Sequence, residues 1–110
     1  MFCLNLNYEA LIMFVHTVLF TLHKGLPVQK QEEFVSEVKK LTTIQPAVLY
    51  TLGSPADTER AVISKDYDYK LTAVFESKKD HDNYQVVKIH DDFRRVVKNY
   101  VAKVIIYDAD

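Results

Sequence analysis

Apolar and polar residues alternate along several short segments of this chain, a pattern that is typical of half-buried β-strands. The first segment covers residues 14–22 and is rich in β-branched and aromatic residues. A second apolar segment covers residues 47–52, and the clearest alternation runs over residues 67–75. Residues 103–108 form the last such segment. The pattern therefore predicts four strands.

Between these strands, apolar residues recur every three or four positions, which predicts amphipathic helices. A helix of about four turns should follow Pro27, because proline suits the first turn of a helix. Its apolar stripe consists of Phe34, Val35, Val38 and Leu41. Ser77 and Asp80 form a capping box, which predicts a further helix start. The apolar residues beyond it fall into two groups, so we expect this helical region in two pieces: His81, Tyr84 and Val87, then Phe93, Val96, Val97 and Tyr100.

The order of elements is β-α-β-β-α-β, which predicts a ferredoxin-like α+β domain. Such a domain has a four-stranded antiparallel sheet with its helices on one face and the other face free. We expect the free face to carry the larger apolar set, with Leu19 and Val74 on the opposite face. That set is His16, Val18, Phe20, Tyr69, Leu71, Ala73 and Phe75. A sheet that is apolar on both faces would expose a large patch, so the sequence predicts a homodimer.

Composition and charge narrow the possible functions. The 110 residues suffice for one domain, and 48% hydrophobic with 26% charged residues is the composition of a globular protein. The formal net charge of -1 provides no basic surface for a polyanion, so we expect no binding to nucleic acid. The single Cys3 cannot form an internal disulfide, which is consistent with a cytoplasmic location.

The first residues of the chain do not fit a targeting or membrane segment. They lack lysine and arginine and include Asn5, Asn7 and Glu9, so neither a signal peptide nor a membrane span is expected. We predict that residues 1–12 are a dispensable extension and that the domain covers residues 13–110. The alternative is a packing helix, whose stripe would consist of Tyr8, Leu11 and Ile12.

Four groups of residues, in this order, resemble the stress-responsive A/B-barrel (Dabb) family. They are residues 15–20 (VHTVLF), residues 66–69 (DYDY) leading into 75–77 (FES), Tyr84-x5-His90-x2-Phe93, and residues 104–108 (VIIYD). The resemblance covers residues 13–110. It implies a dimeric α+β barrel to which each protomer contributes a four-stranded sheet. The family includes plant stress-associated proteins and a polyketide cyclase branch that works without metal or organic cofactor.

The resemblance also implies a site between sheet and helices. The catalytic tyrosine and histidine of the cyclase branch fall on Tyr84 and His90, and a further pocket histidine falls on His16. Tyr69 stands where that branch has a histidine, and Val87-Lys88 stands where the family commonly has His-Pro. On a continuous helix, six residues correspond to about 240° of rotation. Tyr84 and His90 therefore meet only if the chain turns between them.

Three functions remain open at this point. The first is a barrel without catalysis that binds a small apolar ligand. The second is a cofactor-independent cyclase or isomerase of a polyketide-like or enolisable carbonyl compound, with His90 as general base and Tyr84 as hydrogen-bond donor. The third is a haem or quinol monooxygenase. The expected ligand pocket is lined by His16, Val18, Phe20, Phe34, Tyr69, Leu71 and Ala73.

Each candidate residue also has a structural interpretation. His90 could cap the second helical piece while Tyr84 packs over the sheet, and Phe20, Phe34 and Phe75 could fill the pocket. The acidic residues beside His81 and His90 suit helix starts, where the helix dipole favours negative charge. Since no close-spaced pair of histidines or set of cysteines is present, we expect no metal and no cofactor.

Overall fold

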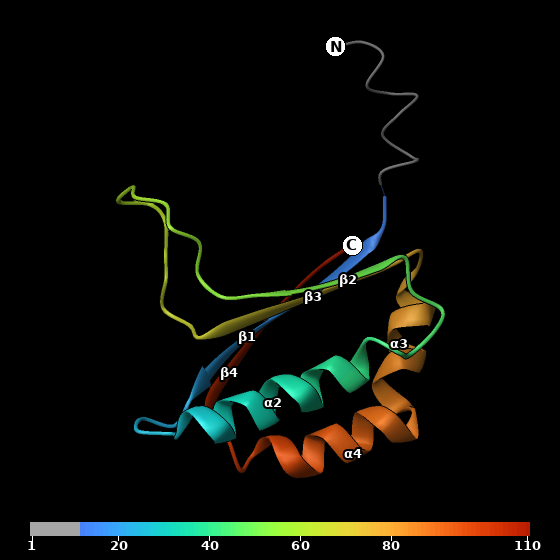
Figure 1. Cartoon of the computed structure of the whole chain (residues 1–110). Helices are drawn as coiled ribbons and strands as arrows, with labels where there is room; N and C mark the ends of the chain where they lie inside the picture. Colours follow the sequence, from blue (N-terminus) through green and yellow to red (C-terminus); the bar gives the residue numbers. More distant parts are fainter. Residues whose placement is uncertain (1–11) are drawn as a thin grey trace.

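The computed structural model describes residues 12–110, so the predicted extension lies outside the described residues except for Ile12. The described elements are, in order, β1 (Phe14–Leu22), α2 (Val28–Leu41), β2 (Leu49–Gly53), β3 (Tyr69–Phe75), α3 (Lys78–Val86), α4 (Lys88–Val97) and β4 (Val101–Ala109) (Figure 1). Every predicted element is present, with the last helical region in two pieces. Both β2 and β3 begin two residues later than expected, and β4 is longer at both ends.

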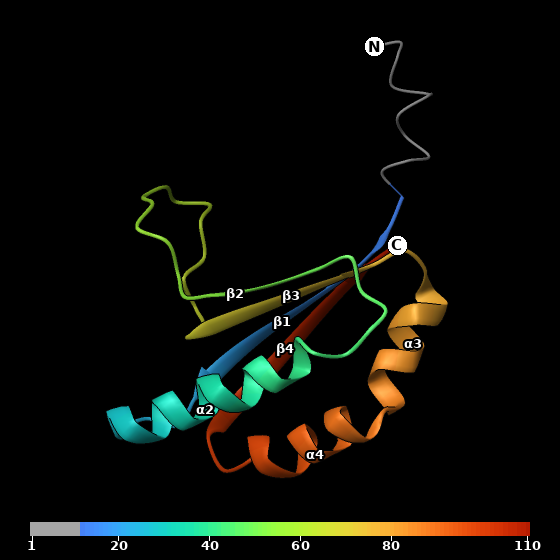
Figure 2. The same cartoon turned by 45° about the vertical axis from the view of Figure 1, so that its right-hand side comes forward.

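The strands form one antiparallel sheet in the order β2-β3-β1-β4. All three helices of the described chain lie on the same side of this sheet, as the two views of Figures 1 and 2 show. This arrangement confirms the ferredoxin-like α+β fold. No helix within residues 12–110 combines the length and the apolar character needed to cross a membrane.

Helix α2 has polar groups at both ends that satisfy the backbone. At its start, the carbonyl of Pro27 accepts hydrogen bonds from the N–H groups of Lys30 and Gln31 at 2.9 and 3.0 Å. At its end, the hydroxyls of Thr42 and Thr43 donate to the carbonyls of the last turn at 2.7 and 2.8 Å. These contacts satisfy groups that a helix end otherwise leaves without partners. They define where the helix begins and ends.

The face of the sheet that packs against the helices is the opposite of the one that we expected. Along β1, the residues from Phe14 to Leu22 alternate between buried and half-buried positions. The buried set contacts the helices and contains His16, Val18, Phe20, Leu71, Ala73 and Phe75. The expectation that these residues lie on the free face was therefore wrong. The bulkiest apolar set pairs with the stripe of α2, because that pairing removes the most apolar surface from water.

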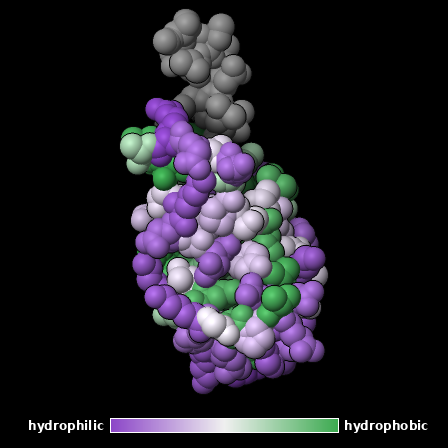
Figure 3. Space-filling model, turned by 60° about the vertical axis from the view of Figure 1, so that its left-hand side comes forward, coloured by the Kyte–Doolittle hydropathy of each residue, from purple (hydrophilic) through white to green (hydrophobic). Residues whose placement is uncertain are grey.

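The open face of the sheet carries the other set of residues. Residues that lie directly opposite one another on neighbouring strands share a face, and Leu19 pairs with Ile105 while Val74 pairs with both Val15 and Leu49. Tyr107 is opposite Thr17 and is 63% exposed. Hydrophobic side chains also reach the surface as a connected area in the view of Figure 3. A single protomer thus leaves apolar surface in contact with water.

Residues 54–68 form the longest connection of the described chain and lie on the side of the sheet away from the helices (Figures 1 and 2). Asp68 ties the end of this loop to β1. Its carboxylate accepts a hydrogen bond of 2.7 Å from the backbone N–H of Leu22, and its own N–H donates to the carbonyl of Phe20 at 2.8 Å. The loop therefore connects the edge strand β2 to the inner strand β3, and its middle is exposed.

Candidate functional site

The chain turns between α3 and α4 at a single residue, Val87. Its backbone is extended (φ -74°, ψ 156°), and it serves as the last boundary residue of α3 and the first of α4. Its carbonyl accepts hydrogen bonds from the N–H groups of His90 and Asp91 at 3.0 and 3.1 Å. An extended conformation is one that a β-branched valine favours. The helix therefore breaks without the proline that the family commonly has at this point.

The break brings Tyr84 and His90 into contact. Their ring centroids lie 4.7 Å apart with the rings nearly perpendicular, at 88°. The geometry is an edge-to-face aromatic contact. Within residues 12–110, no side chain caps the start of α4, so the imidazole of His90 does not have the capping role considered above. Tyr84 packs over the sheet, with its ring centroid 5.2 Å from that of Phe75.

A cavity of about 200 Å³ lies between the sheet and helices α3 and α4. Its lining is mostly apolar, and its polar members are His16, Tyr84, Gln85, His90 and Arg94. The volume is below the range of roughly 300–1,000 Å³ that drug-sized ligands occupy. A small molecule with one or two polar groups is the kind of ligand that fits this space.

Several expected pocket residues line this cavity and others do not. His16, Val18, Phe20 and Leu71 line it together with Tyr84 and His90. Three expected members lie elsewhere: Phe34 and Ala73 are fully buried in the core, and Tyr69 is half-buried beside a surface groove along α2. Phe34 and Phe75 are packed in the core without filling the cavity.

Two polar atoms of the cavity wall are buried without a hydrogen-bond partner. They are the hydroxyl of Tyr84 and Nδ1 of His90, and neither finds a partner among the residues that the structure describes. Leaving such a group unsatisfied costs about 1–3 kcal/mol. Tyr84 is 1% exposed and His90 is 7% exposed, so bulk solvent has little access to either residue. Within residues 12–110, two polar groups at the cavity wall therefore lack protein partners.

Burial determines the charge state of this pair. Desolvation, with a smaller contribution from the nearby Arg94 guanidinium, lowers the pKa of His90 to about 4. Desolvation also raises the pKa of Tyr84 well above its ordinary value. Both side chains are consequently neutral at neutral pH. The tyrosine hydroxyl can donate a hydrogen bond, and the imidazole can donate from one nitrogen and accept at the other.

The low pKa of His90 predicts a pH-dependent stability. The pKa is about 4 in the folded protein and about 6.5 unfolded, so the unfolded state takes up the proton first as the pH falls. The stability that depends on an uncharged His90 is therefore fully present above pH 6.5 and is lost as the pH falls from there to about 4. We expect the free energy of unfolding to fall by about 2 kcal/mol between about pH 7 and pH 4.5 through this group alone. Urea unfolding curves at the two pH values measure it.

A His90→Gln variant is the control for this prediction, because glutamine is polar and has no titrating group. Its free energy of unfolding should decrease less than that of the wild type over the same pH interval. Equal decreases in the two proteins would contradict the assignment of the effect to His90.

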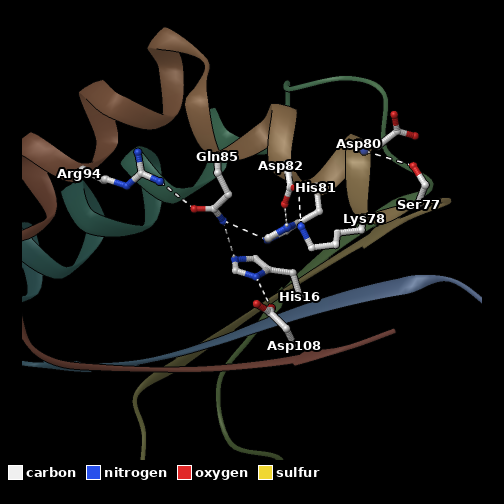
Figure 4. Close-up of polar contacts among 9 residues, drawn as sticks. All are labelled: His16, Ser77, Lys78, Asp80, His81, Asp82, Gln85, Arg94 and Asp108. Atoms are coloured by element: carbon white, nitrogen blue, oxygen red, sulfur yellow. Dashed lines mark hydrogen bonds and ion pairs between the residues drawn. The ribbon is translucent and has the colours of Figure 1, made fainter.

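A second polar cluster borders the same cavity and joins three elements. His16 of β1 contacts Asp108 of β4, with Nδ1 and Oδ1 2.6 Å apart. His81 of α3 contacts its neighbour Asp82, with Nδ1 and Oδ1 3.1 Å apart. The amide nitrogen of Gln85 lies 3.4 Å from Nε2 of His16 and 3.3 Å from Nε2 of His81 (Figure 4). The two imidazoles therefore face the same amide group.

The hydrogen bonds of this cluster determine the tautomers of both histidines. Arg94 donates to the amide oxygen of Gln85 at 2.7 Å, which turns the amide nitrogen toward the histidines. An amide nitrogen is only a donor, so Nε2 of each histidine is the acceptor and Nδ1 carries the proton. Each Nδ1–H then donates to its carboxylate, Asp108 or Asp82. Desolvation lowers the pKa of His16, and the hydrogen bond to Asp108 partly offsets this effect.

Sequence reasoning did not identify Gln85, Arg94 and Asp108 as members of the site. Gln85 is four residues after His81, so helical spacing places both side chains on one face of α3. Asp108 lies directly opposite His16 in the pairing of β4 with β1. A register of the last strand against the first would have revealed this contact. No sequence pattern reveals Arg94, because its hydrogen bond to Gln85 depends on the angle between α3 and α4.

A larger and more open groove of about 620 Å³ lies between α2 and α4. Its charged residues are largely paired with one another: Lys40 with Glu37 at 2.6 Å, and Lys88 with Asp92 at 2.9 Å. Exposed pairs of this kind are ordinary features of helix surfaces. Among the described residues, the smaller cavity is the one that combines unsatisfied polar atoms with an apolar lining, so it is the better candidate.

The model of a protein family described as Stress responsive A/B Barrel Domain (Dabb) matches residues 14–110 of the chain. No protein in a search of curated sequences matches it. Among solved structures, a Dabb family protein with a ferredoxin-like fold from Mesorhizobium loti is 23% identical. The alignment covers 89% of this chain and 95% of that one, with a TM-score of 0.70.

Two further solved structures share this fold. A dimeric ferredoxin-like protein of unknown function from Thermobifida fusca is 17% identical, with a TM-score of 0.70 and coverage of 88% of this chain and 90% of that one. The hydroxynitrile lyase from Passiflora edulis is 16% identical, with a TM-score of 0.71 and coverage of 88% and 91%. At these identities the likeness concerns the fold alone.

Proposed function

This chain belongs to the stress-responsive A/B barrel (Dabb) domain family, and we propose that it is a dimeric barrel that binds a small, mostly apolar molecule bearing a carbonyl or hydroxyl group. The observation that carries the proposal is the pair of unsatisfied polar atoms, the Tyr84 hydroxyl and His90 Nδ1, in an otherwise apolar cavity. An apolar pocket with few polar groups is the usual form of a small-molecule site.

The homodimer is supported by the open face of the sheet. Apolar residues of all four strands lie there, and Val74 has apolar neighbours on both sides, Val15 and Leu49. Most soluble homo-oligomers are two-fold symmetric dimers, in which one surface patch contacts its own copy. The Thermobifida fusca protein of the same fold is described as dimeric. We also propose a cytoplasmic location, which is consistent with a single cysteine, Cys3, that cannot form an internal disulfide.

The proposal is tested by comparing the ligand affinity of a Tyr84→Phe variant with that of the wild type. The substitution removes only a hydroxyl that has no hydrogen-bond partner among residues 12–110, so the free protein should keep or slightly gain stability. A compound that hydrogen-bonds this hydroxyl should bind about 3- to 10-fold more weakly to the variant, as expected for one hydrogen bond. Thermal shift against a panel of small ketones, phenols and aromatic acids identifies ligands, and calorimetry then measures their affinities.

Tyr67→Phe is the matched control, because Tyr67 lies in the loop between β2 and β3 and away from the cavity. It should bind every ligand as the wild type does. Two results would contradict the proposal: no compound of the panel binds, or the Tyr84→Phe and Tyr67→Phe variants bind equally well.

Cofactor-independent proton transfer on an enolisable carbonyl compound is the second candidate. The observation in its favour is the direct contact of a hydrogen-bond donor, Tyr84, with a neutral imidazole, His90. A base with a pKa of about 4 is weak at neutral pH, however, and general-base catalysis is most efficient when the pKa lies near the working pH. Binding is therefore the better supported function. The lyase from Passiflora edulis illustrates that an enzyme can use this fold.

Turnover of any ligand found by the panel separates the two candidates. An enzyme would convert the compound, and His90→Gln would lose the conversion while keeping most of the affinity. The haem monooxygenase considered above receives little support, because a cavity of about 200 Å³ is too small for a macrocycle the size of haem. The phenols of the panel test the quinol alternative.

A further inference from the structure

Two buried histidines and a carboxylate from three different elements meet at the edge of the cavity. His16 of β1 is 2% exposed, His81 of α3 is 8% exposed, and Asp108 comes from β4. One ligand atom from each residue can be chosen so that all lie within 4.8 Å of one another. Imidazole nitrogens are usual ligands of zinc and similar ions in proteins, and a carboxylate commonly orients such an imidazole from its other nitrogen.

Each histidine is already oriented as a ligand would be. Asp108 and Asp82 accept from Nδ1 of His16 and His81, which leaves the lone pair of each Nε2 directed at the amide of Gln85 (Figure 4). A carboxylate that holds the distal nitrogen of an imidazole is the common second partner of a metal-bound histidine. Neither histidine requires a change of tautomer to bind a cation at Nε2.

The two hydrogen bonds of Gln85 to the histidines are long, and their spacing also matches that of ligand atoms in a metal site. Its terminal nitrogen lies 3.4 Å from Nε2 of His16 and 3.3 Å from Nε2 of His81. Hydrogen bonds from nitrogen are ordinarily about 2.7–3.2 Å long. Ligand atoms bound tetrahedrally at about 2.0–2.1 Å, in contrast, lie roughly 3.3–3.4 Å from one another. The terminal group of Gln85 therefore stands at a third ligand position.

We propose that this cluster binds a divalent transition-metal ion of the zinc type, with Nε2 of His16 and Nε2 of His81 as its nitrogen ligands. Asp108 and Asp82 orient the imidazoles, and Gln85 presents its amide oxygen at the third position after a half-turn of the amide. Arg94, which then loses the oxygen of Gln85, keeps its ion pair with Asp91 at 2.8 Å. The fourth position faces the cavity, which His16 and Gln85 both line.

Such an ion would lie in the wall of the ligand cavity and could accept an oxygen atom of the bound molecule. This role differs from hydrogen bonding to Tyr84 and His90, so metal binding is testable without any ligand. The sequence did not indicate the site, because His16 and His81 belong to different elements and show no motif spacing. The two histidines become neighbours only through the packing of α3 on β1.

Cobalt(II) titration of the chelator-treated full-length protein, followed by visible absorption, tests the proposal, and zinc(II) competition then measures affinity. We expect one ion per chain and the absorption of a four-coordinate site. His81→Gln and Asp108→Asn should each weaken binding about 10- to 100-fold, as changes to metal ligands and their orienting carboxylates do. Gln85→Glu should strengthen binding at least about tenfold, because a carboxylate replaces an amide at the third position.

His23→Gln is the control, since His23 could bind metal nonspecifically and does not belong to the cluster. This variant should bind cobalt(II) as the wild type does. Should His81→Gln fail to fold, Asp108→Asn decides, because the Asp108 side chain is 38% exposed and tolerates the change. Absence of binding to the wild type at about 100 μM metal would overturn the proposal, as would unchanged affinity in Asp108→Asn.

Discussion

Replacing Phe34 with alanine is expected to lower the free energy of unfolding by about 3–5 kcal/mol, the usual cost of deleting a buried aromatic ring. Phe34 of α2 has no exposed surface. Its ring centroid lies 5.1 Å from that of Phe20 and 5.6 Å from that of Tyr69, so the side chain connects the helix to two strands. A domain of this size has a total stability of roughly 5–15 kcal/mol, so the loss should be a large share of it.

Val28→Ala is the matched control for this experiment. Val28 begins the same helix and is 71% exposed, so its replacement should change stability by less than about 0.5 kcal/mol. Urea unfolding followed by circular dichroism, with all proteins at one concentration, gives both values. If Phe34→Ala and Val28→Ala unfold at similar urea concentrations, α2 does not hold the core as described.

Replacing Val74 with glutamate should convert the proposed dimer into a monomer. Val74 lies on the open face between Val15 and Leu49, so in the dimer two copies of the new charge would be buried near the interface without a partner. An unpaired charge in such a place costs several kcal/mol, which corresponds to a loss of affinity of a thousandfold or more. In the monomer the same side chain extends into water and the fold survives.

Light scattering at micromolar concentration measures the expected change, a halving of the mass. Val86→Glu is the control, because Val86 is 72% exposed and ends α3 on the other side of the sheet. That variant should keep the mass of the wild type. A wild type that is itself monomeric would refute the dimer, and an unchanged mass of Val74→Glu would place the interface on another surface.

The alternation of apolar residues was sufficient to predict the strands, and it failed at the choice of face. Along β1, one set of alternate residues contains His16 and Phe20 and the other contains Val15 and Leu19, so both sets include apolar residues. Alternation determines which residues share a face, but not which face meets the helices. The packing of α2 against the sheet decides which face is covered, and this packing cannot be read from a local sequence pattern.

The two-piece helix illustrates a success with a local cause. The stripe that contains His81 and Tyr84 and the stripe that contains Phe93 do not continue each other at a helical period, so a turn between them was predictable. The polar wall of the cavity, in contrast, was not predictable from the sequence. Gln85 and Arg94 are ordinary surface residues by type, and they become part of the site only because α3 and α4 meet at an angle.

The conformation of Val87 also matters for the comparison of related sequences. This residue does not line the cavity, yet its extended backbone places Tyr84 beside His90. A relative that keeps the tyrosine and the histidine but continues the helix through this position would have the motif without the site. A relative that breaks the helix here with another residue would retain the geometry. Searches for proteins with this pocket should therefore weigh the helix interruption alongside the identity of the two side chains.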